Sequence, residues 1–214
     1  MATYTPRLSS AGMSGSQYWY SNTNPFLPTF GLPNCTCYAW GRTWENSGTP
    51  PYGLPTGDGG TWFYHQDNYQ RGQVPKLGAI LCMSGGPPGT SGRGHVAVVE
   101  QIYSDGTIMF SNSGYYRGDD PAKWASLYFY KRCASPADNY QSGQHGYDGY
   151  AGYNIQGFIY NPVDFDPEID PGPEPGPGPG PEPPDPGGLY PTRLILFKKQ
   201  FYRNQGRLID GIYH

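Results

Sequence analysis

A cysteine at the expected start of a helix is the residue best suited to chemistry in this sequence. Residues 34–42 read NCTCYAWGR and follow a Gly-Leu-Pro turn. Asn34 is a good N-cap and no proline follows before Glu45, so we expect a helix over residues 35–45 with Cys35 in its first turn. The unpaired N–H groups and partial positive charge of a helix N-terminus favour a thiolate, which is the nucleophilic form of cysteine.

A nucleophilic cysteine needs a base, and His95 has the most suitable surroundings for that role. It lies in GHVAVVEQI at 94–102, whose alternating valines predict a strand. After the hairpin signal Asp105-Gly106, TIMFSNS at 107–113 predicts a second strand with Asn112 near its end. Cysteine, histidine and asparagine in this order correspond to a nucleophile, its base and a group that orients the imidazole.

The other three histidines have poorer contexts. His65 falls in GTWFYHQDNYQR at 60–71, which predicts a second helix, and His145 falls in a Tyr/Gly loop that we expect to be exposed. His214 is the last residue. A histidine on a helix or in an exposed loop is more often structural than catalytic, so His95 remains the candidate.

Several motifs together resemble one known family. In chain order these are NCTCYAWGR, PKLGAILCM at 75–83, GHVAVVEQI, DGTI and SNSGY. They resemble the CHAP family of cysteine, histidine-dependent amidohydrolases/peptidases over roughly residues 24–162. Most such domains cleave bacterial peptidoglycan, often for phages, as an endolysin or a virion-associated lysin. The resemblance implies Cys35 as nucleophile and His95 as base, with Asn112 where relatives often use glutamate or asparagine.

The predicted elements indicate an α+β fold in which N-terminal helices pack on an antiparallel sheet. Cys35 and His95 are 60 residues apart, against roughly 130–150 in papain, so the resemblance implies a minimal papain-like cysteine hydrolase. Besides the two strands around His95 and Asn112, we expect strands at 75–83, 126–133 and 155–161, and a loop at 114–124.

Composition divides the 214 residues into three parts. Residues 1–163 are expected to form the catalytic domain, with 20 Tyr, 9 Phe and 5 Trp in the chain compensating for a low apolar fraction of 36%. Residues 164–188 are an acidic Pro/Gly-rich linker, which should be extended and unpacked. Residues 189–214 are basic and aromatic but too short for a core of their own, so we interpret them as a docking segment.

Charge and hydropathy restrict the partners. Residues 1–165 carry nine basic and ten acidic residues, which makes nucleic acid an unlikely partner. No stretch approaches the roughly 20 apolar residues of a transmembrane helix, and no signal peptide is visible. We therefore expect a protein of the phage virion tail, or of the host cytoplasm followed by release to the wall. Peptidoglycan is the expected partner, with phage tail proteins as candidates for residues 189–214.

No metal or other cofactor is expected. Some CHAP domains carry calcium on an aspartate-rich loop before the nucleophile, but residues 21–32 contain no carboxylate. The four cysteines match no zinc spacing, and a protein made in reducing cytosol is not expected to form disulfides. Cys37, Cys82 and Cys133 are most simply small buried apolar residues. Cys37 also lies about 200° around the helix from Cys35, so it should face elsewhere.

Candidates for substrate contact are Asn34, Tyr115 and Trp124. Exposed aromatic rings can stack on sugar or peptide faces, although in so aromatic a chain packing has the greater weight. Arg42 is better interpreted as part of a structural ion pair. The leading functional hypothesis is a peptidoglycan amidase or endopeptidase. The alternatives are a catalytically inactive wall-binding module and a structural virion tail component with the same fold.

Overall fold

The computed structural model describes residues 2–86, 91–134, 152–165 and 169–170. All of them belong to one compact unit, Met1–Glu174. Most of the predicted linker, the whole C-terminal segment 189–214, His145 and His214 lie outside the described residues. Within the described part, no helix is long and apolar enough to cross a membrane.

The described elements are short helices and a single sheet. The helical elements are α1 (Gln17–Tyr20), α2 (Cys35–Ser47), the 3-10 turn η1 (Gly59–Thr61) and α3 (Pro121–Tyr128). The strands are β1 (Arg71–Gly72), β2 (Ile80–Gly85), β3 (His95–Tyr103), β4 (Ile108–Asn112), β5 (Tyr130–Ala134), β6 (Tyr153–Ile159) and β7 (Ile169–Asp170).

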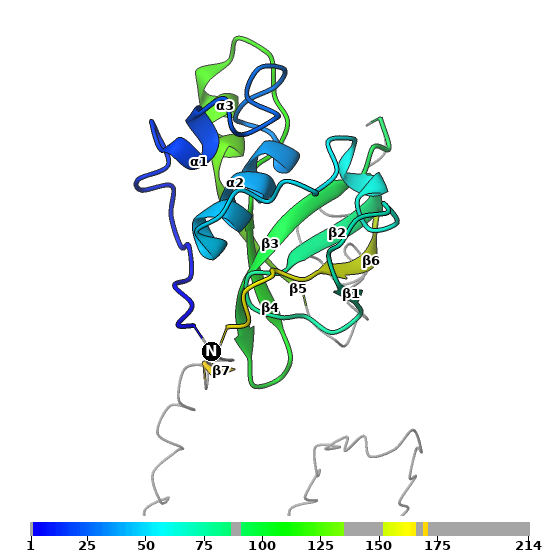
Figure 1. Cartoon of the computed structure of the whole chain (residues 1–214). Coiled ribbons are helices and arrows are strands. Elements are labelled where there is room, and N and C mark those ends of the chain that lie inside the picture. Colours follow the sequence, from blue (N-terminus) through cyan, green and yellow to red (C-terminus); the bar gives the residue numbers. More distant parts are fainter. Residues whose placement is uncertain (1, 87–90, 135–151, 166–168, 171–214) are drawn as a thin grey trace, which may run out of the picture. The chain divides into compact units, whose positions relative to one another are not determined.

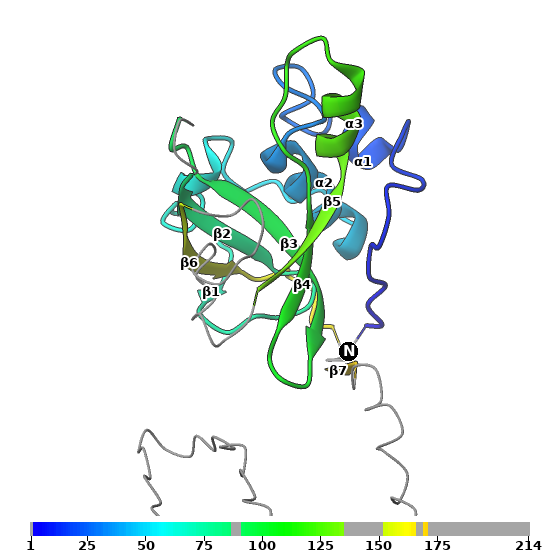
Figure 2. The ribbon, with the colours of Figure 1, turned by 180° about the vertical axis from the view of Figure 1, so that it is seen from behind.

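The sheet has the order β1-β6-β2-β3-β4-β5, and each neighbouring pair along this path is antiparallel. The short β7 pairs with β3 in parallel. Helix α2 lies across one face of the sheet, with α1 beside it (Figure 1), and the reverse view shows β4 and β5 in front of α2 (Figure 2). The predicted α+β fold, helices on an antiparallel sheet, is confirmed.

Helix α2 begins and ends at well-defined caps. The Oδ1 atom of Asn34 accepts a hydrogen bond from the N–H of Cys37 at 2.8 Å, as an N-cap side chain should. At the other end Gly48 has φ 71° and donates its N–H to the carbonyl of Trp44. The helix predicted over residues 35–45 is confirmed and is two residues longer, so Cys35 is its first residue.

The middle of α2 is joined to β3 by a buried ion pair. Glu100 is fully buried and accepts from the Nε and Nη2 atoms of Arg42 at 2.9 and 2.8 Å. The hydroxyl groups of Tyr4 and Ser111 and the backbone N–H of Arg7 also donate to this carboxylate. Every partner that a buried carboxylate needs is therefore supplied, and the structural interpretation of Arg42 is confirmed.

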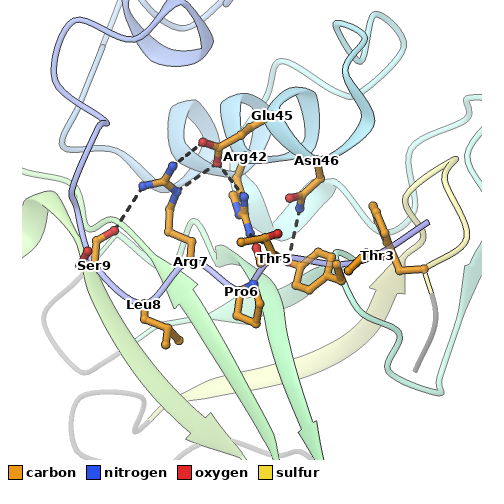
Figure 3. A pocket seen from close by; sticks show the side chains of 11 residues that line it. Thr3, Thr5, Pro6, Arg7, Leu8, Ser9, Arg42, Glu45 and Asn46 are labelled. Atoms are coloured by element: carbon orange, nitrogen blue, oxygen red, sulfur yellow. Dashed lines mark hydrogen bonds and ion pairs between the residues drawn. The ribbon is translucent and has the colours of Figure 1, made fainter. Parts of the chain in front are cut away.

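The N-terminal strap, residues 3–9, crosses the later turns of α2 (Figure 3). Arg7 and Arg42 both form ion pairs with Glu45. A pocket of about 360 Å³ lies between this strap, Arg42, Glu45, Asn46 and Phe165. The strap and the end of the domain meet here, because Phe165 packs edge-on against Tyr4 at 4.9 Å. The chain thus stays packed on the domain just after 164, where the sequence predicts the linker to begin.

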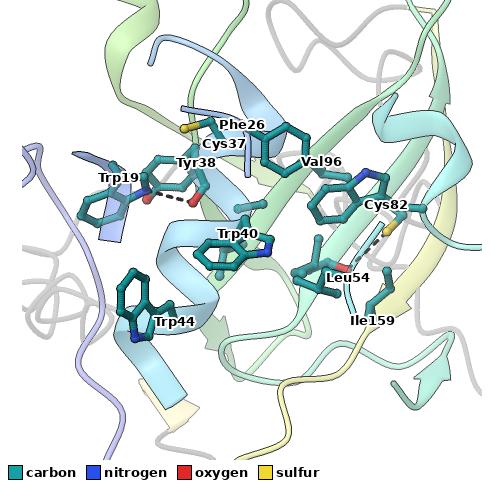
Figure 4. Close-up of a cluster of buried hydrophobic side chains, with 14 of the residues drawn as sticks. Trp19, Phe26, Cys37, Tyr38, Trp40, Trp44, Leu54, Cys82, Val96 and Ile159 are labelled. Atoms are coloured by element: carbon teal, nitrogen blue, oxygen red, sulfur yellow. Dashed lines mark hydrogen bonds between the residues drawn. The ribbon is translucent and has the colours of Figure 1, made fainter. Parts of the chain in front are cut away.

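Alternation along β3 divides the core between the two faces of the sheet. Val96 and Val98 point to the α2 side, where Trp19 and Trp40 belong to the same buried cluster (Figure 4). The residues that alternate with them, Ala97 and Val99, point to the other face and belong to a second cluster with Phe110 and Phe158. His95 directly precedes Val96 and is itself buried at the beginning of β3.

Glycine at position 41 allows α1 to approach α2 closely. A Cβ atom there would lie 2.4 Å from the indole of Trp19, which no packing adjustment of a rigid ring could tolerate. Trp19 is fully buried and donates its Nε1–H to the carbonyl of Tyr38. Trp19 and Phe26 are both buried in this cluster.

Four predicted elements differ from the structure. The helix predicted at 60–71 is wrong, because only the 3-10 turn η1 and further turns occur before β1. The strand predicted at 75–83 begins only at Ile80. The loop predicted at 114–124 is observed only as far as Asp120, because α3 occupies its last residues and the beginning of the strand predicted at 126–133. Asp120 caps α3 by accepting from the N–H groups of Ala122 and Lys123. Strand β5 follows at Tyr130.

Candidate active site

Cys35 lies at the first position of α2 and is partly buried. Burial raises the pKa of its thiol from 9.0 to about 11, although the N–H groups of Val96, Thr36 and Cys35 itself face the sulfur and lower it. Asp58 raises it slightly further. Since Val96 directly follows His95, the sulfur lies beside the start of β3.

His95 begins β3 and is hydrogen-bonded to Asn112 at the end of β4. The His95 Nε2 and Asn112 Oδ1 atoms are 2.8 Å apart. The Asn112 amide is itself oriented, because its Nδ2 donates to the carbonyl of Tyr130 at 3.1 Å. Its oxygen therefore faces the imidazole, so Nε2 carries the proton and Nδ1 is the basic nitrogen.

A glycine-rich turn supports the backbone of His95. A Cβ atom on Gly59 would lie 3.0 Å from the His95 carbonyl carbon, and one on Gly94 would lie 2.3 Å from the Cα of Gly60. Gly60 also donates its N–H to the carbonyl of Arg93 at 2.9 Å. The turn that contains η1 thus packs directly on residues 93–95, and only glycines allow this approach.

At rest, the site is neutral. Burial lowers the pKa of His95 to about 4, even though the hydrogen bond to Asn112 acts in the opposite direction. With a thiol whose pKa is about 11, the resting pair at neutral pH is a thiol and a neutral imidazole. The thiolate expected from the helix N-terminus is not favoured in the structure, because desolvation outweighs the N–H donors.

Cys37 faces a different environment, as its position on the helix predicts. It is fully buried with Phe26 and Trp40, and its carbonyl accepts from the Nδ2 of Asn24. Burial raises its pKa to about 12. All four cysteines are free, so no disulfide competes for Cys35.

The three candidates for substrate contact differ in their surroundings. Asn34 is buried and caps α2, with its Oδ1 accepting from Thr36 and Cys37. Tyr115 is 58% exposed and packs edge-on against Phe30. Trp124 belongs to α3 and stacks on Tyr128 at 4.8 Å.

The loops before Cys35 and after Asn112 are tied together beside the site. The backbone N–H of Asn34 donates to the hydroxyl of Ser113 at 3.1 Å, and that hydroxyl donates to the carbonyl of Leu127. Two residues beyond Ser113, Tyr115 reaches Phe30 of the other loop. Of the two aromatic candidates, Tyr115 therefore lies nearer to the catalytic elements along the chain than Trp124 does.

The other polar groups of the described residues do not form a second centre of this kind. Among the described residues, no group of three or more His, Cys, Asp or Glu side chains could hold a metal ion. His65 is half exposed and lies 3.5 Å from Asp67, away from any helix. The pocket of about 360 Å³ is at the strap, where Arg7, Arg42 and Glu45 pair with one another.

Two residues that were not predicted from the sequence act on the proposed catalytic pair, Cys35 and His95. Tyr153 packs its ring against the imidazole of His95, with centroids 5.7 Å apart. Asp58 stands immediately before η1, and its charge acts on Cys35. The Asp-Gly-Gly run at 58–60 was a usable signal for a tight turn. Nothing in the sequence around Tyr153 distinguishes it from the other tyrosines.

Comparison with known proteins gives a match to one family and matches to solved structures. Residues 19–114, somewhat less than half of the chain, match the CHAP domain. Seven chains of solved structures match. One is the crystal structure of N-acetylmuramoyl-L-alanine amidase from Staphylococcus aureus, 26% identical over 59% of this chain and 32% of that chain, with a TM-score of 0.39. This chain thus spans about a third of that structure. The search of curated proteins found no match to this chain.

Proposed function

The chain carries a CHAP domain at residues 19–114, and from this premise we propose that it is a peptidoglycan hydrolase that cleaves an amide bond. The observation that carries the proposal is the hydrogen bond between His95 Nε2 and Asn112 Oδ1, on a strand whose next N–H faces the sulfur of Cys35. It leaves Nδ1 as the base, which is what a cysteine nucleophile requires.

The proposed reaction is acyl transfer through a thioester. The Cys35 thiol gives its proton to His95 Nδ1 while the sulfur attacks the carbonyl carbon of the scissile amide. The backbone N–H of Cys35, in the first turn of α2, donates to the oxyanion. The imidazolium then protonates the leaving amine as the C–N bond breaks. Neutral His95 next accepts a proton from water, which attacks the thioester, and Cys35 leaves with that proton.

Asn112 has an orienting role in this scheme. It holds the Nε2–H of His95 and so selects the tautomer in which Nδ1 is basic. As a neutral amide it adds no negative charge, so the imidazolium is stabilised less than it would be by a carboxylate. Proton transfer is then coupled to attack, since neither ion is favoured before substrate binds.

The substrate bond is proposed at the level of its class. Candidates are the amide between muramic acid and L-alanine and the amides within the stem or cross-bridge. Purified peptidoglycan should be incubated with the full chain, and the soluble fragments analysed by mass spectrometry. New amino termini with no new reducing ends are expected. Cleavage of glycosidic bonds, or wall binding with no release of fragments, would contradict the proposal, and the latter result supports an inactive wall-binding module.

We further propose a phage source, either as a lytic endolysin or in the virion tail, with residues 189–214 as the docking segment. Their five basic residues and one acid follow a Pro/Gly-rich spacer, which suits a tethered peptide. Deletion of 189–214 should leave wall hydrolysis unchanged and abolish incorporation into the virion. Loss of hydrolysis by the truncated chain would instead assign the segment to wall binding or catalysis.

A further inference from the structure

Tyr153 is held beside the imidazole by the way β6 begins. It pairs with Gly85 of β2 in the sheet register, and Gly86 donates its N–H to the carbonyl of Gly152. A Cβ atom on Gly85 would lie 2.6 Å from that carbonyl oxygen. The two strands therefore approach more closely than residues with side chains would allow, and this approach fixes the backbone from which the Tyr153 ring projects.

The Tyr153 ring contacts His95 in a way that the Asn112 hydrogen bond does not. The ring centroids are 5.7 Å apart, and the planes are inclined at 44°. The hydrogen bond holds one ring atom, Nε2, and leaves the imidazole able to turn about that contact. A second contact on the ring surface restricts this rotation, which sets the direction of Nδ1.

The groups that face His95 come from several elements. They include Asn112 from β4 and Tyr153 from β6. Cys35 of α2 lies against the backbone N–H of the next residue, Val96, and Asp58 before η1 acts on that thiol. Desolvation lowers the pKa of His95. Burial, and then the charge of Cys35, raises the pKa of Tyr153, so its phenol stays protonated and neutral. The ring thus covers the imidazole without adding a charge.

We propose that Tyr153 is a positioning residue whose aromatic ring, rather than its hydroxyl, holds the His95 imidazole for Cys35 and shields it from water. This inference deepens the proposed function and rests on it for its catalytic meaning. Its consequence is that His95 remains a neutral base in mildly acidic solution, where an exposed histidine would be protonated.

The test uses the full chain and a titration that needs no turnover. The pKa of His95 should be measured by NMR in wild type, Tyr153→Phe and Tyr153→Ala, with the signal assigned from His95→Gln. Tyr64→Ala is the matched control, since Tyr64 is 69% exposed. Wild type, Tyr153→Phe and the control should titrate at about 4, whereas Tyr153→Ala should titrate nearer 6.5. If Tyr153→Ala does not fold, Tyr153→Leu should show the same upward shift.

Hydrolysis of peptidoglycan supplies the second measurement. For Tyr153→Ala, kcat/KM should fall about tenfold or more, mainly through kcat, and its acid limb should move to higher pH, while Tyr153→Phe stays within about twofold of wild type. Equal impairment of Tyr153→Phe would assign the role to the hydroxyl and overturn the proposal. An unchanged His95 titration in Tyr153→Ala would also overturn it. If wild type hydrolyses nothing, the proposed function fails, whereas the titration still decides whether the ring shields His95.

Discussion

Where α2 begins, Cys35 and His95 are buried as neutral groups, whereas two turns further along the same helix Arg42 is buried as an ion against Glu100. Both ends of the α2–β3 pair exclude water. Burial works against charge at each of them, yet the outcomes are opposite. The partners decide the difference: a neutral amide beside His95, and a carboxylate beside Arg42.

The charged end is a structural clamp. Burial acts against the charge of Arg42, but Tyr4, Glu100 and Glu45 outweigh it and raise its pKa. Burial and the charge of Glu100 raise the pKa of Tyr4, which therefore remains an O–H donor. Arg42 therefore stays charged and Tyr4 stays neutral at neutral pH, so the two can fix the N-terminal strap on α2.

The neutral end is suited to chemistry instead. A thiol and an imidazole that are both neutral can exchange a proton when substrate arrives, and the ions then exist only during the reaction. One helix can thus hold a permanent ion pair and a proton-transfer pair seven residues apart. The groups packed around each side chain decide which of the two forms.

The largest expected effect comes from breaking the charged end. Glu100→Ala leaves Arg42 buried without its carboxylate, which should lower the free energy of unfolding by about 3–5 kcal/mol. Glu45→Ala is the matched control. Its side chain is 19% exposed, and its loss should be nearer 1 kcal/mol. Urea unfolding followed by circular dichroism measures both, and equal losses would show that burial of Glu100 is not decisive.

Lowering the pH should reduce the free energy of unfolding, because His95 is buried as a neutral imidazole. The folded pKa of His95, about 4, lies below its unfolded value of about 6.5, so its contribution is complete above pH 6.5 and is lost as pH falls toward 4. The loss attributable to His95 should be about 3 kcal/mol. Urea unfolding across this range should show a weaker pH dependence in His95→Gln. Identical pH dependence in the two proteins would contradict the buried neutral imidazole.

The contrast between these ends was only partly predictable from the sequence. Asn34 before a proline-free run located the start of α2, and the alternating valines located β3, because caps and alternation are local signals. The structural interpretation of Arg42 also proved correct. That Glu100 would be its partner, and that Tyr4 would join them, depends on contacts more than 35 residues apart in sequence.

The failures have physical causes that can be named. The aromatic run at 60–71 suggested a helix, but the turn around Gly59 and Gly60 is shaped by its contact with residues 93–95. The start of α3 carried a readable signal in Asp120-Pro121, an N-cap followed by proline at the first helical position. The protonation of Cys35 could not be read from its helix position, since desolvation depends on the residues packed around it.

Asn112 tests how much orientation contributes at the neutral end. Asn112→Ala should lower kcat for wall hydrolysis about 10–100-fold, because the imidazole loses its tautomer selection. Asn112→Asp replaces the amide with a carboxylate and should raise the pKa of His95, which moves the acid limb of kcat/KM to higher pH. A fully active Asn112→Ala variant would remove Asn112 from the site.

The smallest expected effect comes from Asp58, whose carboxylate is the charged side chain that acts on the Cys35 thiol. Its carboxylate raises the pKa of Cys35, and its exposed pairing with Arg93 at 3.3 Å compensates it weakly. Asp58→Asn should therefore shift the pH dependence of Cys35 alkylation slightly to lower pH. Asp105→Asn, at the turn before β4, should leave it unchanged. A shift to higher pH in Asp58→Asn would reverse the assigned sign.

Wall hydrolysis by two variants, each with one cysteine of α2 replaced, is the most direct test that Cys35 is the nucleophile. Cys35 and Cys37 are two residues apart on α2, but only Cys35 faces the start of β3. Release of soluble fragments from purified peptidoglycan should be measured for wild type, Cys35→Ala and Cys37→Ala, with folding checked by circular dichroism. We expect release by wild type and Cys37→Ala and none by Cys35→Ala. Continued release by Cys35→Ala would contradict this expectation.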